Sequence, residues 1–86
     1  MDNPRIRCNV IAYRKGYIEV TAGIHSGCVN IEAWNTDPNL GIDDVDVGDL
    51  PAGAIIGNTE LELSVEMARA LLHALDIAVR RAESVE

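Results

Sequence analysis

The residues best suited to chemistry lie in one acidic stretch, GIDDVDVGDLPAG, at residues 41–53. Carboxylates at this spacing are the ligands that Ca²⁺ and Mg²⁺ prefer. An EF-hand loop that began at Asp44 would need glycine at its sixth position and glutamate at its twelfth, where this chain has Asp49 and Ile55. We therefore predict no metal site, while a looser cation site, a solvated turn and a patch for a basic partner remain as interpretations. The four aspartates of the stretch are Asp43, Asp44, Asp46 and Asp49.

A second candidate is the pair His25 and Cys28, because a thiol beside an imidazole can act as a nucleophile with its base. No phosphate-binding loop, dinucleotide fingerprint or Ser/His/Asp arrangement accompanies them. Strand alternation places Cys8 and Cys28 on opposite faces of a sheet, which excludes a shared zinc ion and a disulfide. We therefore expect no catalysis and no cofactor, with a small enzyme or metal-binding protein as an alternative.

The charge of the chain is unevenly distributed. The formal net charge is −7, and residues 16–68 contain no Lys or Arg but hold ten of the fourteen acids. A phosphate backbone needs clustered cations, and the chain offers such a cluster only near its N-terminus. Direct nucleic-acid binding is therefore disfavoured, and a basic protein is the partner that the charge favours. The N-terminal cations are Arg5, Arg7, Arg14 and Lys15.

Length and composition indicate one small folded domain over residues 1–86. The chain has no Phe, one Trp and two Tyr, so its core must be built from Ile, Val, Leu and Ala. No apolar run approaches the length of a membrane span, and the N-terminus does not resemble a secretory signal. We therefore expect a cytoplasmic protein that does not enter a membrane.

The first 35 residues alternate apolar and polar side chains, which predicts three strands. A turn at 14–16 with Gly16 in the left-handed conformation would pair Ile6 with Ile24. A two-residue Ser-Gly turn would then bring Ile24 opposite Val29. Both registers keep one apolar face across the three strands. The apolar positions are Ile6, Cys8, Val10 and Ala12, then Ile18, Val20, Ala22 and Ile24, then Val29, Ile31 and Ala33.

The opposite face of this sheet carries all the aromatic residues of the chain, Tyr13, Tyr17 and Trp34. Tyr13 would lie opposite Tyr17, and Trp34 would lie near Glu19. Aromatic side chains are enriched at interface hot spots, but they also cover open sheet faces with their polar ends in water. We treat the three as candidate partner-binding residues, with the solvated covering as the alternative.

The second half of the chain predicts further strands. Residues 36–58 are punctuated by Gly and Pro and should hold a short strand, around Asp43–Val47 or Ala54–Ile56. The motif TELELS alternates again, which predicts a last strand with Glu60 and Glu62 on its outer face.

The chain should end in a helix. Ser64 is a suitable N-cap for a helix over residues 65–83, and Asp76 and Arg80 are spaced as an i,i+4 ion pair. Twelve of these nineteen residues are apolar, and one sheet face cannot cover a helix that is apolar on most sides. We therefore predict a homodimer, formed through this helix or through the aromatic face of the sheet. Because many of the apolar residues are alanine, an exposed helix is the alternative.

Together these features predict an α+β fold: an antiparallel sheet of four to five strands (β-β-β-(β)-β-α) with one C-terminal helix packed on one face. The acidic middle favours a non-catalytic protein-binding module of bacterial or phage origin, for example an anti-defence or antitoxin-like inhibitor that covers a basic, nucleic-acid-handling protein. A self-assembling structural subunit is the main alternative. The candidate partner-binding residues are Asp43, Asp44, Asp46, Asp49, Glu60, Glu62, Tyr13, Tyr17 and Trp34.

Overall fold

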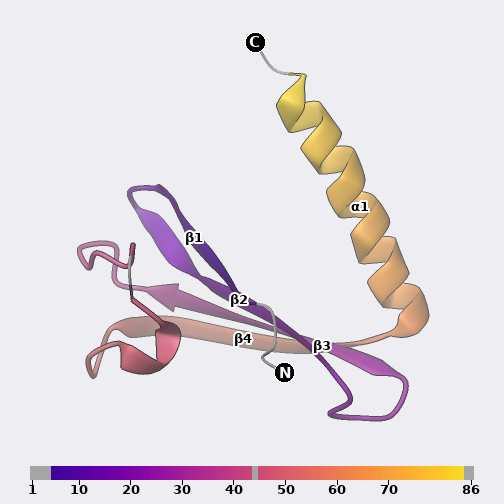
Figure 1. The fold of residues 1–86 in the computed structure, drawn as a ribbon, viewed down its shortest axis with the longest axis horizontal. Helices are drawn as coiled ribbons and strands as arrows, with labels where there is room; N and C mark the ends of the chain where they lie inside the picture. The colour runs from indigo at the N-terminus through magenta and orange to yellow at the C-terminus, as the bar shows by residue number, and fades with distance from the viewer. Residues whose placement is uncertain (1–4, 44, 85–86) are drawn as a thin grey trace.

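The structure is a computed structural model that describes residues 5–43 and 45–84. Within these residues a four-stranded antiparallel sheet in the order β1-β2-β3-β4 is followed by one long helix (Figure 1). This confirms the predicted α+β class and the order of its elements. A fifth strand is not present in the described part of the chain. Of the two places predicted for it, residues 55–56 are extended as the start of β4, and the acidic stretch holds a short 3-10 helix. The elements are β1 Arg5–Ile11, β2 Arg14–Ala22, β3 Cys28–Thr36, η1 Val47–Asp49, β4 Ile55–Ser64 and α1 Val65–Glu83.

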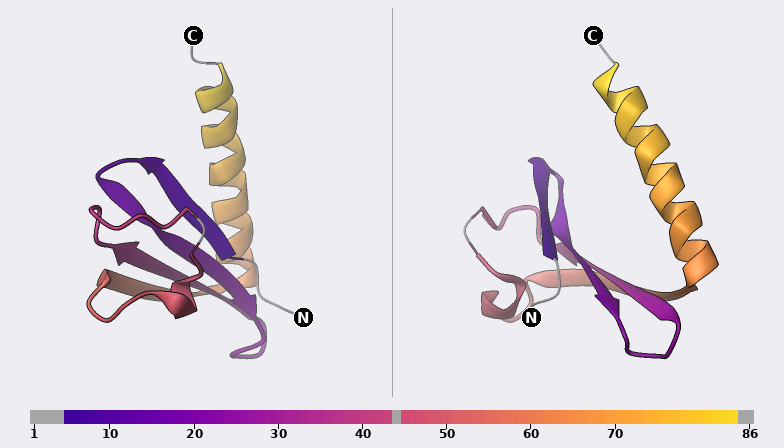
Figure 2. Two further views of the ribbon diagram at one scale, coloured as in Figure 1. Left: turned by 60° about the vertical axis from the view of Figure 1, so that its left-hand side comes forward. Right: turned by 45° about the vertical axis from the view of Figure 1, so that its right-hand side comes forward.

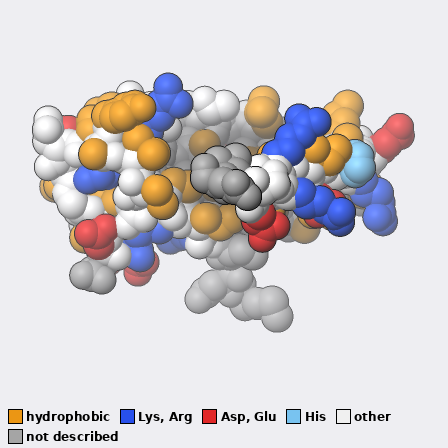
Figure 3. All heavy atoms as spheres, turned by 90° about the horizontal axis from the view of Figure 1, so that it is seen from above, with side chains coloured by type: hydrophobic (Ala, Val, Ile, Leu, Met, Phe, Trp, Pro, Cys, Tyr) orange, Lys and Arg blue, Asp and Glu red, His pale blue; other side chains and the backbone are white. Residues whose placement is uncertain are grey.

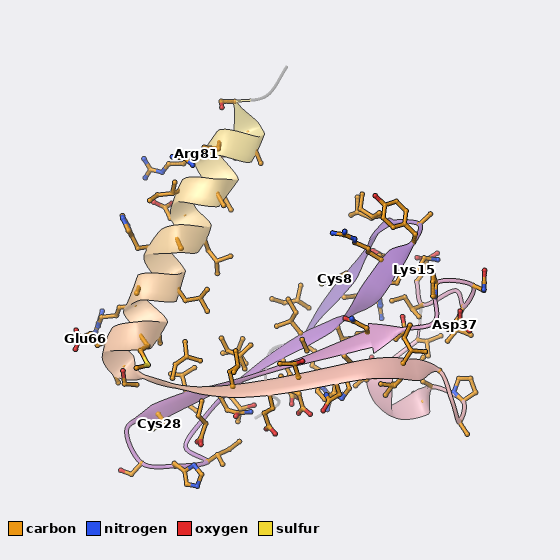
Figure 4. The ribbon with its side chains drawn as sticks, turned by 180° about the vertical axis from the view of Figure 1, so that it is seen from behind. Cys8, Lys15, Cys28, Asp37, Glu66 and Arg81 are labelled. Carbon is orange, nitrogen blue, oxygen red and sulfur yellow. The ribbon has the colours of Figure 1, made fainter. Side chains whose placement is uncertain are left out.

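The two faces of the sheet have the side chains that the alternation predicts. Val20 pairs with Ile31, which in turn pairs with Leu61, so these apolar residues share one face across three strands. We call this side the apolar face, and it turns toward α1 (Figure 4). Its members are Ile6, Ile18, Val20, Val29, Ile31, Leu61 and Leu63. The opposite side, the polar face, carries Glu60 and Glu62 as predicted.

The register of the first hairpin differs from the predicted one. Ile6 pairs with Ile18, not with Ile24, and the turn is formed by residues 12–13. Gly16 lies inside β2 and has no positive φ, so its predicted left-handed role is wrong. The register shift is an even number of residues, which is why the apolar face is preserved. Because Tyr13 is in the turn, it does not lie opposite Tyr17 as predicted.

The second hairpin turns where predicted but pairs differently. The backbone N–H of Cys28 donates to the carbonyl of His25 at 3.1 Å, and Gly27 has a φ of +74°. Strand pairing starts only at Ala22 and Val29, because Gly23 adopts a φ of +90° and takes the chain out of the strand. The predicted pairing of Ile24 with Val29 is therefore displaced by two residues.

The segment 37–54 is a compact loop that folds over the polar face. Its two ends meet, since the backbone N–H of Asp37 donates to the carbonyl of Ala54 at 2.8 Å. Ile42, a residue of the loop, is fully buried, and Tyr17 of the sheet is only 4% exposed. The buried core of the described residues thus lies between this loop and the sheet. We call this segment the Ω-loop, because its ends are close and its own side chains pack inside it, although it is slightly longer than a typical Ω-loop.

The helix begins as predicted but lies differently. The Ser64 hydroxyl accepts a hydrogen bond from the backbone N–H of Met67 at 3.1 Å, and Asp76 and Arg80 form the predicted ion pair. We expected α1 to pack across one face of the sheet. Instead its main contacts are with β3 and β4, and it leaves the sheet at a steep angle (Figure 2). None of its described side chains is buried.

Neither α1 nor η1, the helices of the described residues, has the length and apolar character needed to cross a membrane.

Candidate binding surface on the polar face

The polar face brings carboxylates from three neighbouring strands into one row. Arg5 of β1 pairs with Glu19 of β2, Glu19 pairs with Glu32 of β3, and Glu32 pairs with Glu60 of β4. We call Glu19, Glu32 and Glu60 the acidic row. Like charges directly opposite each other in a sheet are destabilising. The row therefore concentrates negative charge on one surface at a cost to the fold.

Neighbouring side chains hold the acidic row in place. The guanidinium of Arg5 donates to Glu19 at 2.8 Å from the edge strand. The amide of Asn30, a residue that is only 6% exposed, donates to Glu60 at 2.8 Å, and the amide of Asn58 donates to Glu32 at 3.1 Å. Amide donors orient a carboxylate without cancelling its charge. The row is therefore ordered before any partner binds.

Glu62 extends this surface by one more carboxylate. It pairs with Asn30 across the ladder and contacts the Nδ1 atom of His25 through its carboxylate. The His25 ring thus points toward Glu62. The contact of His25 with Cys28 is the backbone hydrogen bond of the turn. Cys28 is a free, half-buried thiol on the polar face, and Cys8 lies on the apolar face, which confirms that the two cysteines are on opposite sides.

The aspartate loop is fastened to the same side of the sheet. The hydroxyl of Tyr17 and the guanidinium of Arg7 both donate to the carbonyl of Val45. The side-chain amide of Asn9 donates to the Asp43 carboxylate. These contacts place the Ω-loop beside the acidic row, on the polar face (Figure 4).

The loop aspartates are accessible. Asp43, Asp46 and Asp49 are all exposed, and the backbone N–H of Asp49 donates to the carbonyl of Asp46 around η1. Asp44 lies outside the described residues. The loop and the acidic row therefore present carboxylates from one side of the sheet.

The three aromatic residues do not form one exposed cluster. Tyr17 is buried beneath the loop, whereas Tyr13 is 72% exposed in the first turn, with the Arg14 guanidinium 5.7 Å from its ring centroid. Trp34 is half-buried and pairs with Tyr17 and with Asn58. Of the aromatic candidates, only Trp34 therefore lies next to the acidic row with part of its surface open.

Within residues 5–43 and 45–84, no three His, Cys, Asp or Glu side chains are grouped in a way that could hold a metal ion.

Sequence reasoning missed Glu19 and Glu32 as members of this surface. The alternation of side chains is consistent with the face on which both residues lie, but the predicted register places Trp34 near Glu19. The actual register is displaced by two residues, so that Glu32 takes this place. The contribution of Asn30 and Asn58 was also missed, because it depends on the same cross-strand neighbours. When the register of a strand is displaced by an even number of residues, each side chain stays on the same face of the sheet, but its cross-strand neighbours change.

Protein-family models, curated proteins and solved structures were each compared with this chain, and none of them matches it. The function is therefore inferred from the chain's own contacts and charges.

Proposed function

We propose that this protein is a non-catalytic binding module that docks its acidic polar face onto a basic surface of another protein. The observation that carries the proposal is the acidic row, in which three carboxylates stand directly side by side in the ladder. Like charges opposite each other destabilise the ladder, and Arg5 offsets the charge of Glu19. A cationic partner would neutralise the repulsion on binding, and complementary charge also speeds association.

The fixed geometry of the surface supports a specific partner. Amide donors from Asn30 and Asn58 hold two of the carboxylates, so less side-chain freedom is lost when a partner binds. Glu62 lies beside the row, and the exposed aspartates of the loop lie on the same side. A groove that binds nucleic acid has the required positive charge, so an inhibitor that covers such a groove is the specific form of the proposal.

The proposal is tested by salt-dependent capture. The tagged chain is incubated with nuclease-treated bacterial or phage-infected lysate, and retained proteins are eluted with rising salt and identified by mass spectrometry. We expect a basic protein that is lost as the salt rises. Glu32→Gln, Glu60→Gln and Glu62→Gln combined should slow its association roughly tenfold or more at low salt and flatten the salt dependence.

A matched control separates this surface from net charge. Glu66→Gln, Asp76→Asn and Glu83→Gln combined remove the same three charges from exposed positions on α1. This variant should bind the basic protein as the unmodified chain does. Docking through the polar face would be contradicted if both variants bound the basic protein as well as the unmodified chain does. It would also be contradicted if both variants lost the same amount of binding.

A further inference from the structure

The apolar face is uncovered in the single chain. Leu61, on its last strand, is 62% exposed, and Ile6, on its first strand, is 53% exposed. Toward the first hairpin the face is hollowed by about 490 Å³, in a concavity lined by residues that include Ile18, Ala33 and Ile56. Seen from above, hydrophobic side chains are open over both the sheet end and the helix end of the molecule (Figure 3). A contiguous apolar surface of this kind on a sheet is typical of an interaction site.

The helix turns a second apolar surface toward the same side. Ala68 is half-buried, so the face of α1 that bears it is the one turned to the sheet. Residues at alternating spacings of three and four continue this face and form what we call the helix seam: Ala68, Leu71, Leu75, Ala78 and Ala82. Leu75 is 53% exposed. Glu66 and Arg81 point away from the sheet (Figure 4).

The helix follows β4 without a connecting loop. Ser64 is the last residue of β4, where it pairs with Cys28, and it is also the N-cap of α1. The direction in which α1 leaves the sheet is therefore set by the strand ladder and by the cap together.

The solvent-accessible area that the chain exposes in excess of a compact domain is as large as an extensive protein interface. The chain exposes 6667 Å², whereas a compact folded chain of its mass exposes about 5,000 Å². Its radius of gyration is 14.6 Å, against about 12 Å for a compact domain of this length. The excess of about 1,700 Å² per chain is roughly twice what each partner buries in an interface of standard size. It falls in the range of obligate dimers.

We propose that a second copy of this chain covers both surfaces by exchange of helices. In this arrangement α1 of each copy lies on the apolar face of the other, with its helix seam against Ile31 and Leu61 and beside the helix of that copy. A two-fold axis makes the two contacts identical, so both apolar surfaces of each chain are covered at once. The small alanine side chains of the seam allow the helix to approach the sheet of the other copy closely.

The charge distribution agrees with a second copy as the occupant. Each chain carries a net charge of −7, and two such chains repel unless their acids stay apart. The acidic row and the Ω-loop lie on the polar face, the side of the sheet away from this contact. Acidic side chains in the view from above lie mostly toward its edges (Figure 3). Helix exchange therefore leaves the proposed binding surface of each copy free.

The first test is the mass of two variants in solution. Leu75→Asp places a charge in the helix seam, and the matched control His73→Asp places the same side chain at an exposed polar position of α1 outside the seam. Sedimentation equilibrium should give twice 9.3 kDa for the unmodified chain and for His73→Asp. Leu75→Asp should shift the mass to that of one chain or unfold it. A dimer that Leu75→Asp leaves intact would overturn the proposal.

Cysteine cross-linking decides where the helix lies, even if Leu75→Asp fails to fold. Cys8 and Cys28 are replaced by Ser, and a chain with Leu75→Cys is mixed, unfolded and refolded with a chain carrying Ile31→Cys. Helix exchange predicts a disulfide between the two different chains. Cross-links only between two Leu75→Cys chains would overturn it. An intramolecular disulfide in a single chain that carries both Ile31→Cys and Leu75→Cys would overturn it as well. No partner protein is present, so this result is independent of the proposed function.

Discussion

At the scale of the single residue, Gly16 shows how a strand can require the absence of a side chain. A Cβ atom built at this position collides with the carbonyl oxygen of Trp34 on β3 and lies 3.1 Å from its carbonyl carbon. A backbone carbonyl cannot move aside as a flexible side chain can. Glycine here therefore permits the close approach of β2 and β3, which keeps their register.

Gly16→Ala should therefore destabilise the protein. The two strands must separate or shift, and overpacking of this kind costs about 1–3 kcal/mol of unfolding free energy. Urea denaturation measures the change. Gly48→Ala is the control, because Gly48 has open space around it and no positive φ, and we expect it to stay within about 0.5 kcal/mol. Equal stability of the two variants would show that the close approach is not needed.

At the scale of the element, the Ω-loop depends on a few side chains of the sheet. Tyr17 contributes both its buried ring and its hydroxyl, which donates to the carbonyl of Val45. Arg7 donates to the same carbonyl. The loop that presents the aspartates is therefore fastened from β1 and β2, far from its own ends in the sequence.

Tyr17→Phe should loosen this loop while the sheet persists. The ring stays buried and one hydrogen bond is lost, which costs about 1 kcal/mol, because Arg7 still donates to the carbonyl. Hydrogen exchange across residues 37–54 should become faster. Tyr13→Phe removes a hydroxyl from an exposed tyrosine and should leave the exchange unchanged. Unchanged exchange in Tyr17→Phe would mean that the hydroxyl does not hold the loop.

The elements themselves were predictable because they follow from local rules. The alternation of side chains fixed the faces of the strands, and Ser64 with the apolar run after it fixed the start of α1. The register of the first hairpin was not predictable in the same way. Its turn at residues 12–13 has no turn-favouring residue, and Asn9 and Val10 stand opposite Lys15 in a bulge.

The placement of the larger parts was also beyond local rules. The Ω-loop is held by contacts between residues far apart in the sequence, such as Asn9 with Asp43. The position of α1 depends on the junction at Ser64, where strand and helix meet without a loop. The spacing of apolar residues along α1 shows that the helix has a wide apolar surface. It does not show which other part of the protein, or which other molecule, packs against that surface.

At the scale of the whole molecule, the two sides of the sheet have different occupants in our account. We propose that a second copy covers the apolar face and the helix seam, and that a basic protein binds the acidic row with the Ω-loop. The buried core of the described residues lies under the loop, so one chain alone leaves most of its large aliphatic side chains in water. A chain of 86 residues has little stability to spare for this exposure.

The most direct test of this account is the dependence of unfolding on chain concentration. If two copies share one core, dilution favours the unfolded chains by mass action. The urea midpoint of the unmodified protein, measured by circular dichroism, should then rise steadily over a hundredfold increase in concentration. A midpoint that stays constant over this range, with one cooperative transition and the helix signal intact, would show that the single chain is stable alone and would contradict the account.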